Sequence, residues 1–185
     1  MDYLLQDPNP KSPRVIIYIN ICILFLCFSL CNDFFNHRDI SCVSFFNYSL
    51  IYYLFNIYSD SFQSALKYLK DTEVDFNNVL IMTSDFNIRN CLWDPNFQYH
   101  SLHRNTLFDI ADSFQLEISR PTKFFPIRYS NNGQDSNLVL DLVFLQPNST
   151  EQNNHHIHPD WRLVSDHAPI SVNISIAKEH IQTMK

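Results

Sequence analysis

The feature that most constrains this chain is a short apolar run that stops abruptly in polar residues. Val79–Met82 is apolar, and the polar-rich stretch Thr83–Asn87 follows it directly. A short apolar run bounded by turn residues is typical of a buried strand. Asp85 and Asn87, two residues apart, are therefore expected at the exit of that strand, where rigid backbone holds them. Such a scaffold edge is a common place for catalytic groups.

Composition indicates a folded chain and excludes several classes of function. Of the 185 residues, 45% are hydrophobic and 15% aromatic, which favours one domain with a real core. The formal net charge of -6 argues against a surface that grips nucleic acid everywhere, but it allows a local groove or a metal-assisted site. The single glycine, Gly133, excludes glycine-rich nucleotide-binding loops, so no nucleotide cofactor is expected.

An uncharged run near the N-terminus leaves two interpretations open. Val15–Asn32 carries no charged residue, and its length approaches that of a membrane span. Against a span, Asn20 lies within the run, and its many Val, Ile, Tyr and Phe residues favour strands. A break near Asn20 predicts two adjacent core strands, whereas the alternative is a membrane anchor over Val15–Cys31. Residues 1–13 are interpreted as an irregular arm.

Hydrophobic periodicity predicts the remaining elements. Further strands are expected over 41–46, 50–58, 124–129, 138–145 and 169–176. One helix is expected after the capping stretch 59–61, with Phe62, Ala65, Leu66 and Leu69 on one face, and a second over 106–114. The stretch 146–161 is expected to be a long polar loop.

Asp141 is a carboxylate inside the apolar run Leu138–Leu145. Burying a carboxylate is costly unless it has a partner. One interpretation is a strand residue that faces solvent or pairs with an arginine such as Arg162. The other is a carboxylate that orients a histidine, because an acid bonded to one imidazole nitrogen fixes the tautomer and raises the basicity of the other nitrogen.

His167 is the candidate for that histidine, since it lies just before the final expected strand. Its neighbour Asp166 offers a hard oxygen ligand of the kind that Mg²⁺ prefers. A second histidine cluster, at 155, 156 and 158, lies in the expected polar loop and is interpreted as solvated surface. Tyr58 ends its strand, and its hydroxyl fits either a wet interface or a contact to a ligand.

Three motifs occur in a fixed order: Ser84-Asp85-Phe86-Asn87, Leu140–Phe144 and Ser165–Ile170. Their order and spacing resemble the endonuclease/exonuclease/phosphatase family, which has the DNase I-like fold. The resemblance is narrower to the endonuclease domain of fungal LINE-type retrotransposons, with Trp93, Arg120-Pro121-Thr122 and Trp161 as supporting signs. It implies a four-layer α/β/β/α sandwich of class α/β over residues 14–177, followed by a tail over 178–185.

The resemblance also implies an activity, a cofactor and a partner. The activity is phosphodiester hydrolysis in DNA by a metal-dependent endonuclease, with Mg²⁺ as the ion and Mn²⁺ as its substitute. The residues implied are Asp85, Asn87, Asp141 and His167 as catalytic groups, Tyr58 as a phosphate contact and Asp166 as a metal ligand. In these roles Asp85 acts on the attacking water, Asn87 stabilises transition-state charge, and His167 contacts the phosphate or shares acid–base duty.

Two departures from the family's pattern limit these expectations. Ser84 stands where the family has a glycine, which predicts a turn tighter than a side chain favours. The family also begins with a strand ending in asparagine, followed by a strand and helix that carry a metal-binding glutamate. The residues before Val15 are too few for that unit, so the sandwich is expected to lack its first strand and helix. Impaired catalysis is therefore expected, with an inactive fragment or a membrane-anchored protein as alternatives, and a nuclear or cytoplasmic location is favoured.

Overall fold

The structure is a computed structural model of the 185-residue chain. It describes residues 3–5, 15, 17–19, 27–31, 37–47, 50–60, 62–72, 77–94, 96–101, 103–121, 127–128, 139–147, 154–161 and 166–174. The expected strand over 124–129 lies largely outside these residues.

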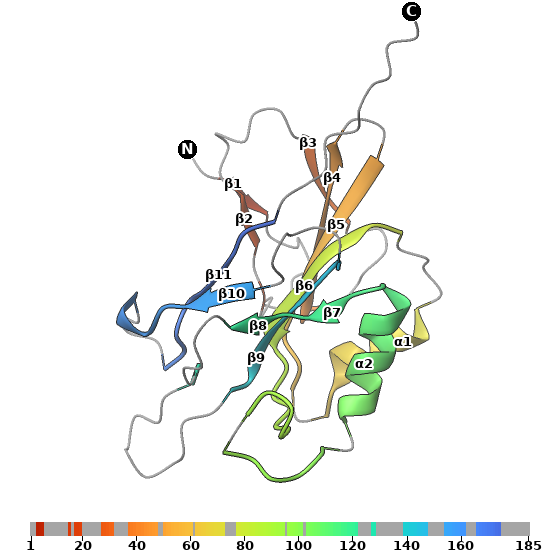
Figure 1. The fold of residues 1–185 in the computed structure, drawn as a ribbon. Helices are drawn as coiled ribbons and strands as arrows, with labels where there is room; N and C mark the ends of the chain where they lie inside the picture. Colours follow the sequence, from red (N-terminus) through yellow and green to blue (C-terminus); the bar gives the residue numbers. More distant parts are fainter. Residues whose placement is uncertain are drawn as a thin grey trace, which may run out of the picture.

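A mixed six-stranded sheet forms the centre of the molecule (Figure 1). In spatial order its strands are β3 (Cys27–Leu30), β4 (Ile40–Asn47), β5 (Leu50–Ile57), β6 (Val79–Asp85), β9 (Asp141–Leu145) and β7 (Glu117–Ile118). Among the described strands of this sheet only β5 and β6 pair in parallel, and the chain between them contains a helix. The strands expected at 41–46, 50–58 and 79–82 are all present, because apolar runs of this length bury well in a central sheet.

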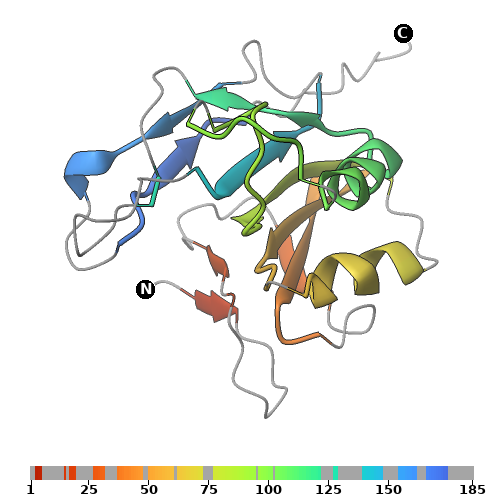
Figure 2. The same ribbon diagram turned by 90° about the horizontal axis from the view of Figure 1, so that it is seen from below.

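Two helices cover one face of this sheet, and both views show them on the same side of it (Figures 1 and 2). Helix α1 (Ser64–Asp71) and helix α2 (Arg104–Ser113) lie near the predicted positions. Their buried residues are Ala65, Leu66 and Leu69 in α1, and Leu107, Ile110 and Ala111 in α2. The expectation for Phe62 was wrong: it precedes α1 and is 79% exposed. The Asp60 carboxylate accepts a hydrogen bond from the backbone N–H of Ser64, at 3.2 Å, and so satisfies the first N–H of the helix.

A smaller sheet packs on the other face. It consists of β11 (Ile170–Val172), β10 (Asn154–Ile157) and β8 (Arg120–Pro121). Ile170 and Val172 pack against a buried cluster on β6 and β9 that includes Val143. The described residues thus form a layer of helices, a large sheet and a smaller sheet, which confirms the α/β class.

The N-terminal expectations need two corrections. Strand β1 (Tyr3–Leu5) pairs with β2 (Ile17–Ile19), so the first thirteen residues are not wholly irregular. The two strands expected within the uncharged run exist as β2 and β3, but they belong to different sheets, since β3 pairs with β4. Within the described part of the chain, no helix is both long and apolar enough to cross a membrane.

The C-terminal third also differs from expectation. The stretch 146–161 is not a loop throughout, because it contains β10 and the 3-10 turn η1 (Pro159–Trp161). His155 is buried, at 4% exposure, because it shares the inward face of β10 with Ile157. The interpretation of all three clustered histidines as solvated surface was therefore wrong for His155. Strand β9 begins at Asp141 rather than enclosing it, and the final strand is limited to Ile170–Val172.

Candidate active site

Most of the predicted site residues lie at one end of the central strands of the large sheet. The β5 exit, the β6 exit and the β9 start meet there, because β5 and β6 are parallel while β9 runs antiparallel to β6. The N–H of Ser59 donates to the Asp85 carbonyl at 3.0 Å, which ties the residue after Tyr58 to the β6 exit. Asp85 and Asp141 are direct partners in the β6–β9 register. Their like charges therefore face each other across the sheet edge.

A histidine closes this carboxylate pair. Asp85, Asp141 and His167 offer ligand atoms that all lie within 4.8 Å of one another. His167 Nδ1 is 2.6 Å from Asp141 Oδ2, and His167 Nε2 is 3.9 Å from Asp85 Oδ2. An ionised carboxylate can only accept a hydrogen bond, so Nδ1 carries the proton and donates to Asp141. The other nitrogen, Nε2, is thereby directed toward Asp85.

The position of His167 is fixed by Ile127 and Arg128, the two described residues of the strand expected over 124–129. Arg128 and His167 form an isolated antiparallel bridge, and the N–H of Ala168 donates to the Ile127 carbonyl at 2.7 Å. Arg128 Nε also donates to Asp166 Oδ2 at 3.1 Å. The other oxygen of Asp166, Oδ1, lies 3.9 Å from His167 Nε2. Arg128 thus holds the backbone of His167 and the side chain of Asp166.

Burial and neighbouring charge shift the pKa values of these groups in different directions. Partial burial, and then the Asp141 charge, raise the pKa of Asp85. The hydrogen bond to Asp141 raises the pKa of His167. Burial acts to raise the pKa of Asp166, but the Arg128 hydrogen bond and the His167 charge lower it overall. Asp85 is consequently a stronger base than an ordinary aspartate, and His167 holds its proton to higher pH than an ordinary histidine.

Asn87 clamps the Asp85 side chain. Its backbone N–H donates to Asp85 Oδ1 at 3.1 Å, and its Nδ2 donates to the Ser59 carbonyl at 2.8 Å. Asn87 has a φ of 51°, a left-handed conformation that asparagine tolerates better than most residues. Ser84, in contrast, lies buried within β6 and is not among the residues with positive φ. The tight turn is therefore at Asn87, and the concern about a missing glycine at Ser84 was misplaced.

The loop after Asn87 is built for packing. The Trp93 ring is 6% exposed, and its indole N–H donates to the Ile88 carbonyl at 3.0 Å. The Arg89 guanidinium lies 4.6 Å from the centre of the Phe97 ring and 3.7 Å from the buried Asp94 carboxylate. These contacts account for both residues without a role in ligand binding.

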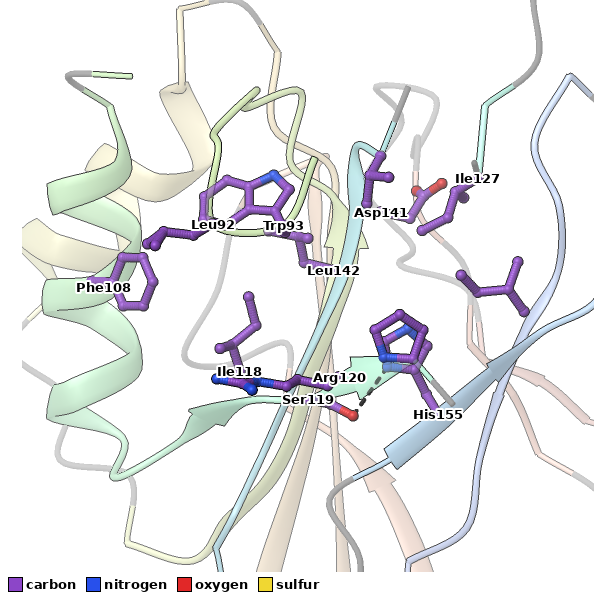
Figure 3. Close-up of a pocket in the computed structure, with 13 residues that line it drawn as sticks. Leu92, Trp93, Phe108, Ile118, Ser119, Arg120, Ile127, Asp141, Leu142 and His155 are labelled. Carbon is purple, nitrogen blue, oxygen red and sulfur yellow. Dashed lines mark hydrogen bonds between the residues drawn. The ribbon is translucent and has the colours of Figure 1, made fainter. Parts of the chain in front are cut away.

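A cavity of about 420 Å³ lies beside Asp141 (Figure 3). Trp93, Phe108 and Leu142 line one side of it, and Ile127 and His155 line the other. His155 Nδ1 lies 3.0 Å from the Ser119 hydroxyl, and burial, followed by the charge of His156, lowers the pKa of His155 to about 4. The sequence signal for His155 was the alternation His155-His156-Ile157, which is too short to separate a strand from a loop.

Comparison with known proteins gives a family and several solved structures with a similar fold. The family model described as "Endonuclease-reverse transcriptase" matches residues 50–171. The endonuclease domain of TRAS1, a telomere-specific non-LTR retrotransposon, aligns with a TM-score of 0.65 at 16% identity, covering 83% of this chain and 71% of that one. A mannosyl-6-phosphatase from Bacteroides thetaiotaomicron aligns with a TM-score of 0.44 at 17% identity, covering 74% of this chain and 57% of its own. No curated protein sequence is significantly similar.

The fold and the acid–histidine site define a DNase I-like α/β domain. Because the family model spans more than half of the chain, the chain belongs to the endonuclease-reverse transcriptase family, within the endonuclease/exonuclease/phosphatase group. The family expected from the three ordered motifs is thereby confirmed. The TRAS1 comparison independently supports the fold.

Proposed function

We propose that this domain hydrolyses phosphodiester bonds in DNA with the help of a divalent cation. The observation that carries the proposal is the Asp85–Asp141–His167 cluster at the sheet edge, with its ligand atoms within 4.8 Å. Membership of an endonuclease family supports nucleic acid as the substrate. The likeness to a retrotransposon endonuclease domain supports DNA in particular.

Asp85 and His167 have the properties of a general base and a general acid. A water molecule can hydrogen-bond to both at once, because their 3.9 Å separation is well under twice a hydrogen-bond length of about 2.8 Å. The raised pKa of Asp85 makes it a better acceptor for the proton of that water. The raised pKa of His167 keeps a proton on Nε2, which can be donated to a phosphate oxygen or to the leaving oxygen.

Asp141 acts through His167 in this scheme. Its hydrogen bond to Nδ1 orients the ring and stabilises the imidazolium. Asn87 holds Asp85 Oδ1 through its backbone N–H, so the other oxygen of Asp85 is presented to the water. We assign Asn87 to stabilising charge in the transition state, and Tyr58 to a phosphate contact. The position of Tyr58 directly after β5, one strand from Asp85, supports that assignment.

The donor set fits a magnesium ion. Asp85 Oδ2 and Asp166 Oδ1 each lie 3.9 Å from His167 Nε2, so a hydrated ion bound to one of these carboxylates would lie near the other. Mg²⁺ is commonly held by one or two carboxylates while it keeps several waters, and Mn²⁺ accepts similar oxygen ligands. When bound there, the ion would neutralise phosphate charge. We assign Asp166 to hold the ion, with Asp85 near enough to contact a water molecule that the ion would carry.

Nicking of a supercoiled plasmid tests the proposal. The purified chain should convert supercoiled to open-circular DNA with Mg²⁺ and should stop when EDTA is added. Asp85→Ala should lower the rate by roughly 10²- to 10⁴-fold, since it removes the proposed general base. Asp109→Ala is the matched control, because Asp109 is a 57% exposed aspartate that pairs with Lys70 on the helix face and should leave the rate unchanged.

The same assay separates the active enzyme from a fold that has lost catalysis. Equal nicking by the wild type and by Asp85→Ala would contradict the proposed site. Absence of nicking by the wild type, with retained Mg²⁺ binding measured by calorimetry, would support an inactive domain. The third interpretation, a membrane anchor over Val15–Cys31, predicts that carbonate leaves the protein in the membrane fraction.

A further inference from the structure

Trp161 is an exposed aromatic residue that the proposed reaction does not use. Its side chain is 61% exposed, whereas the other tryptophan, Trp93, is buried. One face of the Trp161 ring is covered by His158: the ring centres are 3.8 Å apart and the planes differ by 7°. Tryptophan is enriched at binding surfaces, because its large apolar ring can cover a partner while its N–H stays available for a hydrogen bond.

The stacked pair is held rigidly in place. The backbone N–H of Trp161 donates to the His158 carbonyl at 3.1 Å, which closes the η1 turn. His158 Nε2 lies 2.7 Å from the Ser171 hydroxyl on β11. The His158 ring is therefore fixed by β11 from one side, and the Trp161 ring rests on it. A fixed aromatic ring loses little conformational entropy when it binds a partner.

The pair also lies close to the proposed active site. The N–H of His158 donates to the Pro169 carbonyl at 2.9 Å, and Pro169 is two residues from His167. Neighbouring strands are about 4.8 Å apart, so η1 begins one strand spacing from the segment that carries His167. Both views show η1 at the outer end of β10, on the side of the molecule away from the helices (Figures 1 and 2).

The distance from Trp161 to the reaction centre fits a DNA strand. Trp161 is six residues from His167, so the chain limits their Cα separation to about 20 Å. Because a DNA strand rises about 3.4 Å per nucleotide, that distance corresponds to about six nucleotides at most. The exposed Asp160 beside the ring repels phosphate, which favours contact with a base over contact with the backbone.

We propose that Trp161, backed by His158, is a stacking platform for an unpaired base of the DNA strand held at the Asp85–Asp141–His167 cluster. This inference rests on the proposed function and specifies its substrate. A base inside a duplex has both faces covered by its neighbours, whereas an unpaired base offers a face to an aromatic ring. The platform therefore selects DNA with an unpaired base within a few nucleotides of the cleaved bond.

Tryptophan fluorescence tests the contact directly. The Trp93→Phe variant leaves Trp161 as the only tryptophan of the chain. Its emission should be quenched saturably by a 15-nucleotide single strand and by a duplex with one unpaired base, in EDTA so that no hydrolysis occurs. A fully paired duplex of the same sequence should quench at much higher concentration. Equal quenching by paired and unpaired DNA, or no quenching by any DNA, overturns the proposal.

Binding of labelled DNA, measured by anisotropy in the wild-type background, gives a second test that does not depend on Trp93→Phe. Trp161→Phe should bind the single strand within about threefold of the wild type, while Trp161→Leu and Trp161→Ala should bind roughly tenfold or more weakly. Trp161→Leu separates ring stacking from general apolar contact. The control is Phe46→Ala, because Phe46 is a 49% exposed aromatic residue at the opposite end of β4 from the site.

The outcomes distinguish this inference from the proposed function. If the wild type does not nick DNA but the emission of Trp161 is still quenched by unpaired DNA, the hydrolytic function is contradicted and the stacking platform is supported. Nicking that persists while Trp161→Leu binds like the wild type would refute the platform alone. Circular dichroism of each variant verifies that its fold is retained.

Discussion

Two histidines near Asp141 show how the partner of a side chain decides its chemistry. His155, on β10, is 4% exposed and lies 3.0 Å from the Ser119 hydroxyl. His167, just before β11, has a side chain that is 27% exposed and lies 2.6 Å from the Asp141 carboxylate. Burial lowers the pKa of His155 to about 4, whereas the hydrogen bond to Asp141 raises the pKa of His167.

Burial alone does not separate the two, because it disfavours the imidazolium in both. The difference is the charge of the partner: a neutral hydroxyl cannot compensate the lost solvation of an imidazolium, but a carboxylate can. His155 is therefore a neutral group at neutral pH, on the strand of the small sheet that lines the cavity. His167 is the one of this pair that is suited to carry a proton in a reaction.

The largest expected difference between the two histidines is in catalysis. His167→Ala should lower plasmid nicking by roughly 10²- to 10⁴-fold, because it removes the proposed acid. His155→Phe keeps a ring in the buried position and should leave the nicking rate within a few-fold of the wild type. Both rates are measured with the same plasmid and the same Mg²⁺ concentration.

A similar loss of nicking rate in His167→Ala and His155→Phe would contradict the distinction between a catalytic and a packing histidine. Each variant is therefore unfolded with urea first, so that a loss of stability in His155→Phe is not mistaken for a loss of chemistry. A His167→Gln variant serves as a further control, because it retains a hydrogen-bond donor without an acid–base group.

Replacing the carboxylate partner should make His167 behave more like an ordinary histidine. In Asp141→Asn the ring loses its charged partner, so its pKa should fall from the raised value, as followed by NMR titration of the imidazole. Nicking should drop by roughly 10²-fold, and its alkaline limit should move to lower pH because the proton leaves His167 earlier. An unchanged His167 titration in this variant would show that Asp141 does not set its pKa.

The contact of Asp141 with a histidine illustrates what sequence reasoning can supply. A carboxylate in the apolar run Leu138–Leu145 needs a partner, and His167 precedes a strand with clean alternation, so pairing the two was a reasonable inference. Strands β4, β5 and β6 could also be predicted, since each is a long run with β-forming residues. These features are local, and local patterns determine them.

Features that depend on contacts between residues far apart in the sequence could not be predicted. Nothing in the chain near Arg128 indicates that it bridges to His167 and donates to Asp166, because both contacts exist only once the chain has folded. Strand β10 was missed because its four residues are mostly polar and pair with β8 and β11. Strand β1 was missed because three residues form it by pairing with β2.

The two histidines should change the pH dependence of the free energy of unfolding in opposite directions. The pKa of His155 is lower in the folded state than the ordinary 6.5, so the unfolded state binds more protons between pH 6.5 and about 4, and stability falls as the pH falls. That shift corresponds to about 3 kcal/mol over the window. The raised pKa of His167 acts oppositely: its contribution is full below pH 6.5 and is lost as the pH rises through the folded pKa.

Urea unfolding at a series of pH values measures both slopes. His155→Phe should lose less stability than the wild type between pH 6.5 and 4, whereas His167→Gln should lose less as the pH rises above 6.5. Parallel curves for the wild type and His155→Phe would indicate that His155 titrates normally in the folded protein.

The smallest expected effect is at Arg128, which pairs with the backbone of His167 and with the side chain of Asp166, whereas Asp141 binds the His167 ring. The Arg128 and Asp166 side chains are 45% and 35% exposed, so Arg128→Gln should change the free energy of unfolding by less than about 1 kcal/mol. It should nevertheless raise the pKa of Asp166, because the guanidinium hydrogen bond lowers that pKa in the wild type. The carboxylate titration is followed by NMR, and nicking should fall only several-fold.

Lys70→Gln is the matched control for this last variant, since it breaks the exposed Lys70–Asp109 pair on the helix face. The two variants should therefore cost similar stability, but only Arg128→Gln should alter nicking and the Asp166 titration. An equal, null effect of both on nicking would mean that Arg128 only helps to stabilise the fold. Since Arg128 contacts both the backbone of His167 and the carboxylate of Asp166, a reduced rate with unchanged stability would instead show that the reaction depends on the position of these two residues.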